Sequence, residues 1–175
     1  QEMQLIKNSG GVVQIVGFSQ YLRPLTQATQ DKLNALRARF DLPPLPNLAM
    51  ALMPGDPIIA AWPEQKFGEY ASQLYAILEE EPKASLTDLG DAIDYAVRKI
   101  GIDHVGISSD FNEGGGVKGW ENVGDTRNVT AELLSRGYSE ADIAKLWGGN
   151  FLRVWAQVEK AAKPALATAG DTPQP

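Results

Sequence analysis

Two short apolar runs, residues 12–18 and 104–109, are the only convincing candidates for β-strands in this sequence, and long helical stretches separate them. Near-continuous β-branched runs of this kind are typical of strands buried on both faces of a parallel sheet. Two strands do not close such a sheet, and each buried strand needs neighbours on both sides to satisfy its backbone. We therefore expect the C-terminal part of a larger α/β domain, or a chain that folds against another chain supplying the missing strands.

Helical periodicity fills most of the remaining sequence. Apolar residues recur at helical spacing, or helix starts and stops are present, in the stretches 1–7, 26–40, 64–81, 85–100, 129–136, 139–147 and 150–162. The clearest start signal is Ser85-Leu86-Thr87-Asp88, a variant of the capping box, and Gly101 closes that helix just before the second strand. Helix, short turn and buried strand form half of a βαβ unit.

The remaining segments differ in composition from the helices. Residues 41–63 are rich in proline and also apolar, which predicts a long packed loop. Residues 163–175 are small, contain proline and end without charge, which predicts a disordered tail. Asn150 is expected to cap the last helix.

The charge of the chain excludes some classes of function. With a net charge of −6, the chain lacks the basic surface that binds nucleic acid or an anionic membrane. The stretch 131–155 scans as a helix-turn-helix, but Glu140 and Asp142 make packing helices the better explanation. No apolar run approaches the length of a membrane span.

Cysteine and histidine limit the metal chemistry. The chain has no cysteine, so disulfides and thiolate metal sites are excluded, which fits the cytoplasm and the periplasm equally. With His104 as its one histidine, the chain cannot build a His-rich zinc site by itself. His104 lies at the non-catalytic end of the second strand and is better explained as a structural residue than as a ligand.

Asp110 stands where the second strand ends and a glycine-rich loop begins. Catalytic groups in parallel α/β proteins gather at the C-terminal ends of strands, so Asp110 is the first candidate for a catalytic residue. The alternative is a carboxylate that caps a turn or pairs with a basic neighbour. Gly106, within the strand, is expected to admit a close backbone neighbour. The glycine run 114–116 lacks the Lys-Ser/Thr of a phosphate-binding loop, and a flexible active-site rim explains it better.

Three segments, in this order, resemble the membrane dipeptidase (renal dipeptidase-like) zinc metallopeptidases. They are GIDHVGISSDF at 101–111, TAELLSRGYSEADI at 130–143 and GGNFLRV at 148–154. The resemblance implies the C-terminal portion of a TIM (β/α)₈ barrel of the amidohydrolase type, with residues 12–18 and 105–109 as its seventh and eighth strands. Residues 1–162 would then be the C-terminal part of one metallo-dipeptidase barrel domain.

The resemblance also implies a reaction. Family members hydrolyse dipeptides at a pair of zinc ions, and their His, Asp and Glu ligands come from earlier strands. No metal ligand is therefore expected in this chain, and the zinc ligands are expected upstream of Gln1. Asp110 matches the family's catalytic aspartate, which carries a proton from the metal-bridging water to the leaving amine. A zinc-bound water has a pKa of about 7, so a nearby carboxylate can take its proton.

Residues beside the two strand ends are candidates for contact with the substrate. Tyr21, just past the first strand, matches a family tyrosine near the substrate, and Asn112 and Trp120 follow the second strand. The packing of a core or loop is the commoner role of tryptophan. The sequence departs from the family at Asn112-Glu113, where Asp-Gly is usual, and at Ala92, where a histidine is common. These departures bear on substrate preference more than on reaction type.

These observations predict a zinc-dependent dipeptidase, of which this chain is the part that supplies the catalytic aspartate. It is expected to be inactive without the N-terminal half of the same barrel, from the same polypeptide or a partner chain, and a homodimer stays open. One alternative is a non-catalytic remnant that completes a barrel or binds a partner. Another is a different amidohydrolase-type hydrolysis on the same barrel. The compartment is unknown from the sequence, with a periplasmic or other extracytoplasmic location slightly favoured.

Overall fold

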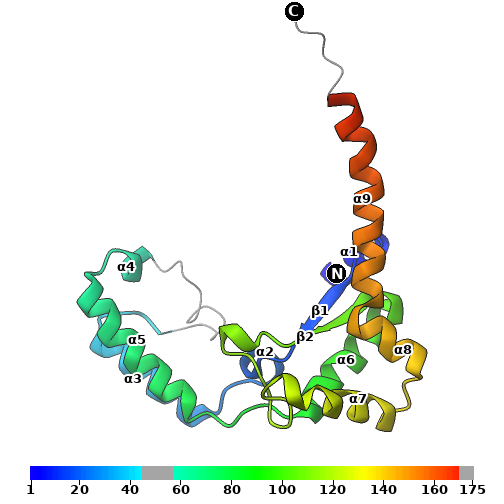
Figure 1. The fold of residues 1–175 in the computed structure, drawn as a ribbon. Helices are drawn as coiled ribbons and strands as arrows, with labels where there is room; N and C mark the ends of the chain where they lie inside the picture. Colours follow the sequence, from blue (N-terminus) through cyan, green and yellow to red (C-terminus); the bar gives the residue numbers. More distant parts are fainter. Residues whose placement is uncertain (45–56, 170–175) are drawn as a thin grey trace, which may run out of the picture. The chain divides into compact units, whose positions relative to one another are not determined.

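The computed structural model describes residues 1–44 and 57–169, and side chains up to residue 162. The chain divides into two compact units (Figure 1). The first unit is formed by residues 1–17 together with the chain from Ser85 onward, and the second by Phe18–Ala84. The second unit has a core of its own. That residues 1–162 are the C-terminal part of one metallo-dipeptidase barrel domain stays a prediction. Within the described residues, no helix combines the length and apolar character that a membrane span requires.

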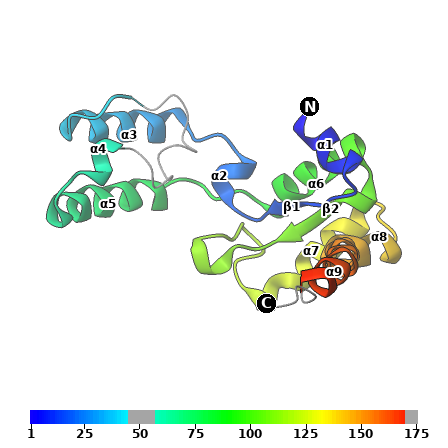
Figure 2. The ribbon, with the colours of Figure 1, turned by 90° about the horizontal axis from the view of Figure 1, so that it is seen from above.

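The first unit contains two parallel strands, which lie side by side in Figures 1 and 2. They are β1 (Val13–Val16) and β2 (Val105–Ser108), paired in register from Val13 opposite Val105 to Val16 opposite Ser108. The predicted parallel pair is confirmed. Val105 and Ile107 project to the same face of β2 and are buried.

The other face of the strand pair explains Gly106. The side chain of Gln14 lies over it, so that a Cβ at position 106 would come within 2.3 Å of the amide oxygen Oε1. The close neighbour of Gly106 is therefore a side chain, and the backbone neighbour predicted from the sequence is wrong. Glycine at this position leaves the space above the strand to the Gln14 amide.

Helix α6 (Leu86–Ile100) leads into β2 and packs against both strands and against α1 (Glu2–Asn8). It starts at the predicted capping box: Ser85 Oγ accepts from the N–H of Asp88 at 3.3 Å, and Asp88 Oδ2 accepts from the N–H of Ser85 at 2.7 Å. Its apolar stripe is almost inaccessible to solvent and consists of Leu89, Ile93, Ala96 and Ile100. Burial of each large side chain contributes about 1.5–3 kcal/mol.

A short 3-10 turn at Ile102–His104 joins α6 to β2. After β2 come two more 3-10 turns, Phe111–Glu113 and Val123–Asp125, and then helices to the end of the unit. They are α7 (Thr126–Ser135), α8 (Glu140–Ala144), a π-helical turn (Lys145–Gly149) and α9 (Asn150–Ala169). Ser139 caps α8, since its Oγ accepts from the N–H of Asp142. α7 begins three residues before the predicted position.

Two predictions about the last helix need correction. Asn150 does not cap α9, because its own backbone is helical and a kink at Gly148 joins α8 to α9. α9 also runs past the predicted end near residue 162, through an alanine-rich stretch that includes Pro164, to Ala169. Residues 170–175 lie outside the described residues, and their disorder stays a prediction.

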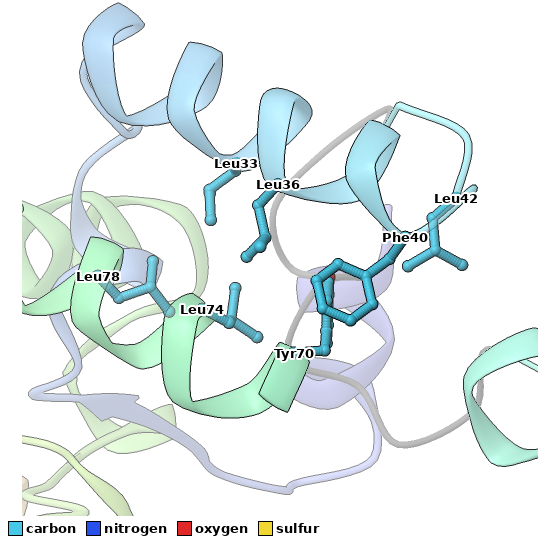
Figure 3. Close-up of a cluster of buried hydrophobic side chains, with 7 residues drawn as sticks. All are labelled: Leu33, Leu36, Phe40, Leu42, Tyr70, Leu74 and Leu78. Atoms are coloured by element: carbon cyan, nitrogen blue, oxygen red, sulfur yellow. The ribbon is translucent and has the colours of Figure 1, made fainter. Parts of the chain in front are cut away.

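The second unit contains helices alone among its described residues. They are α2 (Ser19–Leu22), α3 (Gln27–Arg39), α4 (Pro57–Ala60) and α5 (Glu64–Glu79). Figure 3 shows side chains of α3 and α5 pointing toward one another in a buried cluster of Leu33, Leu36, Phe40, Leu42, Tyr70, Leu74 and Leu78. Ile59 and Trp62, from the proline-rich stretch, pack against this cluster, so the described end of that stretch is packed as predicted. Residues 45–56 lie outside the described residues.

Candidate active site

Asp110 lies two residues beyond the end of β2, just before the 3-10 turn Phe111–Glu113. Its backbone is left-handed, with φ 58° and ψ 28°. Among the described residues other than glycine, only Asp41 shares a positive φ. This conformation costs an L-residue about 1–2 kcal/mol, although aspartate and asparagine visit it more readily than most. Such conformations cluster at functional sites, where surrounding structure enforces them.

The glycine loop after Asp110 is a hydrogen-bonded turn. The N–H of Gly115 donates to the carbonyl oxygen of Asp110 at 2.8 Å. The N–H of Gly116 donates to the carbonyl oxygen of Gly17, just past β1, at 2.6 Å. The N–H of Gly17 in turn donates to the carbonyl oxygen of Ser108 at 2.8 Å. The loop predicted to be a flexible rim is therefore tied to the ends of both strands.

The Asp110 carboxylate is half-buried and receives no hydrogen bond and no ion pair from any residue in the described part of the chain. The alternative role for Asp110, as a turn cap or as the partner of a basic side chain, finds no support there. Within the described residues, backbone hydrogen bonds hold this residue, and neither carboxylate oxygen has a partner there.

Trp120, a candidate for substrate contact, is 2% exposed. Its ring makes edge-on contacts with Phe111 and Trp147, at centroid distances of 5.3 and 5.8 Å. Its Nε1 donates to Thr126 Oγ1 at 3.2 Å, and a Cβ at Gly17 would come within 2.9 Å of the ring. These contacts favour the alternative role, a packing residue beneath the strand ends, and contact with substrate stays a prediction.

The other two candidates are exposed. Asn112 lies in the turn after Asp110, where its Nδ2 donates to Glu113 Oε1 at 3.4 Å. Tyr21 lies in α2 of the second unit and is 63% exposed, with its ring packed on Phe18 at 4.9 Å. Asn112 is thus beside Asp110 along the first unit, whereas Tyr21 belongs to the second. A substrate role for either residue stays a prediction.

The one histidine has a structural contact. His104 Nδ1 lies 2.8 Å from the carbonyl oxygen of Gly11, so Nδ1 carries the proton of a hydrogen bond to the chain before β1. Across residues 1–44 and 57–169, no three His, Asp or Glu side chains gather in a way that could hold a metal ion. The described residues therefore do not fit a zinc site.

Arg136, at the end of α7, is the centre of an ionic network that was not predicted from the sequence. The guanidinium donates to Glu132, Asp91 and Asp94 at 2.7–2.8 Å. Tyr138 Oη also donates to Asp94, at 2.7 Å. Burial opposes the charge of Arg136, but the hydrogen bonds to these carboxylates outweigh it and raise the pKa of the guanidinium. Burial and the hydrogen bond to Asp94 raise the pKa of Tyr138.

Gly90 makes room for this network, because a Cβ there would come within 2.3 Å of Arg136 Nε. The segment 130–143, in which the family resemblance was noted, thus contributes side chains that link α6 to α7 by ion pairs and hydrogen bonds. Its signal in the sequence was weak, since the acceptors Asp91 and Asp94 are far from Arg136 along the chain.

Asn150 and Arg153 make a second group of contacts that was not predicted, at the N-terminal end of the strands. Asn150, 3% exposed, donates from Nδ2 to the carbonyl oxygens of Ile102 and Val105 at 2.7 and 2.8 Å. Arg153 donates to the carbonyl oxygens of Gly10 and Asp103 at 2.9 and 2.7 Å. Both side chains fasten α9 to the backbone that enters the strands.

The sequence of this chain matches a known family. Residues 1–168 match the family model of the membrane dipeptidases, peptidase family M19. The chain belongs to the membrane dipeptidase family. The membership predicted from three sequence segments is confirmed, and with it the class of hydrolases to which the chain is related.

Individual proteins similar to this chain are also named as dipeptidases. Dipeptidase aclJ of Aspergillus oryzae is 41% identical over 95 residues, which cover 54% of this chain and 22% of the relative. Dipeptidase 3 of Homo sapiens is 33% identical over 85 residues, 48% of this chain and 17% of the relative. The crystal structure of the probable dipeptidase PvdM from Pseudomonas aeruginosa superposes with a TM-score of 0.83 and 75% identity over 91% of this chain and 40% of that chain. The chain therefore spans less than half the length of these membrane dipeptidases.

Proposed function

We propose that this chain is the C-terminal part of a zinc-dependent dipeptidase with a (β/α)₈ barrel, and that it supplies the catalytic carboxylate, Asp110. One observation carries the proposal. Asp110 is held by its backbone in a left-handed conformation at the C-terminal end of a parallel strand, and no described residue occupies its carboxylate. This is the place and the state in which parallel α/β enzymes keep a catalytic group.

The chemistry asked of Asp110 is proton transfer. Hydrolysis of a peptide bond requires that the attacking water lose a proton and that the leaving amine gain one. A single carboxylate performs both transfers in turn, as a general base and then as a general acid, which is worth about 10²–10⁴-fold in rate. The absence of a described cation or donor beside the carboxylate leaves it free for this exchange.

The described residues do not fit a zinc site, so we propose that the ligands to zinc come from the parts of a dipeptidase that this chain does not span. Features of the first unit support further barrel around it. Two paired strands leave one backbone edge of each without a described partner. The buried amide oxygen of Gln14 likewise has no described hydrogen-bond partner.

A stripe on α9 supports the same proposal. Large apolar side chains at helical spacing are 45–64% exposed there, namely Phe151, Leu152, Trp155 and Val158. Contiguous exposed apolar surface of this kind marks a contact with another part of a protein. We propose that the N-terminal half of the barrel covers this stripe and the free strand edges.

The test is to purify the polypeptide that carries this sequence from its natural source and to measure its intact mass, zinc content and hydrolysis of a panel of dipeptides. The proposal predicts a barrel-length polypeptide, or a pair of chains of that combined length, with zinc and with dipeptidase activity. A zinc-free protein that hydrolyses no dipeptide would instead support the non-catalytic, partner-binding alternative. Zinc with hydrolysis of another amide or ester would support a different amidohydrolase-type reaction.

A further inference from the structure

We propose that Gly115 is a positioning residue that sets the direction of the Asp110 carboxylate. The proposal rests on the function proposed for Asp110 above. The carbonyl oxygen of Asp110 accepts two backbone hydrogen bonds, from the N–H of Gly115 at 2.8 Å and from the N–H of Glu113 at 3.1 Å. The turn that follows Asp110 therefore closes back on the peptide group of Asp110 itself and holds its left-handed backbone.

Position 115 has no room for a side chain. A Cβ there would lie 2.3 Å from the carbonyl oxygen of Ser109, 2.5 Å from that of Asp110 and 2.6 Å from the carbonyl carbon of Asp110. All three atoms belong to the main chain, so no side-chain rotation can relieve the contact. Any other residue at position 115 must displace the peptide groups on either side of the Asp110 Cα, from which the carboxylate projects.

The neighbouring glycines have a different requirement. Gly114 and Gly116 adopt φ angles of 87° and 118°, which glycine tolerates, but a Cβ at Gly116 would meet its nearest atoms only at 3.5 Å. Gly116 is therefore required for its backbone angle, whereas Gly115 is pressed against the backbone of Asp110.

The far side of the turn is anchored, which directs the displacement toward Asp110. The N–H of Gly116 is bonded to the carbonyl oxygen of Gly17, and Gly17 is bonded to Ser108. A ring carbon of the buried Trp120 lies against Gly17, so the end of β1 cannot readily move away. The strain of a larger residue at 115 is thus relieved at residues 109 and 110.

The expected consequence is kinetic. A displacement of about 1 Å in a catalytic group can cost about 10²-fold in rate. Gly115→Ala in the complete dipeptidase is expected to lower kcat by about 10- to 100-fold while KM for the dipeptide changes by less than about 3-fold, because Gly115 itself touches only backbone. The pH dependence of the residual kcat is expected to shift as well, because a turned carboxylate has new surroundings.

The matched control is Gly137→Ala. Gly137, after α7, has a φ of 89°, so alanine is strained there too, but no atom lies within 4 Å of the added Cβ. Both variants are expected to lose thermal stability, and only Gly115→Ala to lose kcat. Equal kcat values for Gly115→Ala and the parent enzyme, or an equal loss in Gly137→Ala, would overturn the proposal.

Two further measurements separate this proposal from the proposed function. A crystal structure of Gly115→Ala is expected to show the Asp110 backbone moved from φ 58°, whether or not the protein hydrolyses dipeptides, and an unmoved Asp110 would overturn the proposal. If the alanine variant does not fold, an ester in place of the Gly115 amide removes its N–H without adding volume. That protein is expected to lose kcat by a few-fold, and full kcat would overturn the proposal. A parent enzyme inactive on dipeptides would refute the proposed function alone.

Discussion

The N–H of Gly116 donates a hydrogen bond of 2.6 Å to the carbonyl oxygen of Gly17, and so joins the loop after β2 to the end of β1. The carboxyl ends of two strands that are far apart in sequence are thereby fixed to each other. Asp110 follows this junction, and in the described part of the chain its backbone is hydrogen-bonded while its carboxylate has no partner. This arrangement is the one expected for a group that exchanges protons.

The backbone strain at Asp110 predicts that glycine at this position keeps or raises stability and abolishes activity. Asp110→Gly in the complete enzyme is expected to leave the free energy of unfolding unchanged or to raise it by up to about 1 kcal/mol, because glycine adopts φ 58° without steric cost. Dipeptide hydrolysis is expected to be lost. Denaturant unfolding and a hydrolysis assay on the same sample measure both effects.

Asp41→Gly is the control for this experiment. Asp41 has the same φ of 58° and is not among the candidate site residues, so glycine is expected to have the same effect on stability and none on hydrolysis. A loss of more than about 1 kcal/mol in Asp110→Gly would show that the aspartate side chain stabilises the fold, and the proposal of functional strain would then fail.

The Arg136 network predicts a large structural effect away from the candidate active site. Arg136→Met is expected to lower the free energy of unfolding by about 2–4 kcal/mol, because Asp94 loses a cationic partner where its side chain is 25% exposed. Lys32→Met removes a lysine from an ion pair with Glu80 whose side chains are 51% and 64% exposed, and is expected to cost less than about 1 kcal/mol. Equal effects in the two variants would show that the network contributes no more than a surface pair.

In the second unit, the hydrogen bonds between Glu81 and the start of α3 are expected to depend on pH. Glu81 accepts from the N–H and Oγ1 of Thr26, the N-cap of α3, at 2.9 and 2.8 Å. Burial raises the pKa of Glu81, but hydrogen bonds from Thr29 and Thr26 outweigh it and lower the pKa below its ordinary value of 4.5. A lowered pKa in the folded state means that this carboxylate stabilises the fold above about pH 4.5. That contribution is lost as the pH falls through the folded-state pKa.

Hydrogen exchange of the α3 amides between pH 7 and pH 3, corrected for intrinsic rates, measures this link. Protection at the start of α3 is expected to fall in the acid range, and Glu81→Gln is expected to have lower protection at pH 7 and a smaller change on acidification. The link would be refuted if Glu81→Gln kept the full acid-dependent loss.

Local signals in the sequence were enough for the parts of the fold that are local in origin. The capping box at Ser85 lies within four residues, and it is confirmed. The two strands were predicted from their apolar runs because a buried parallel strand has a distinctive composition. Asp110 was selected as the candidate catalytic residue because catalytic groups gather at the C-terminal ends of parallel strands.

Long-range contacts were not predictable in this way. Asn150 was expected to be a helix cap, but its amide reaches the carbonyl oxygens of Ile102 and Val105 through tertiary packing. Gly106 was recognised as a position of close approach, yet nothing local indicates that the side chain of Gln14 makes it. The left-handed backbone of Asp110 likewise depends on Gly115 returning to its carbonyl oxygen. Each of these contacts joins residues whose pairing only the folded chain defines.

The most direct test of the central claim is the kcat of Asp110→Asn for dipeptide hydrolysis in the complete enzyme. Asparagine has nearly the same shape and also tolerates the left-handed conformation, so the fold, the thermal stability and the zinc content are expected to be preserved. The amide cannot carry the proton, and kcat is expected to fall by about 10²–10⁴-fold. An Asp110→Asn enzyme with more than about a tenth of the parent kcat would contradict the catalytic role of Asp110.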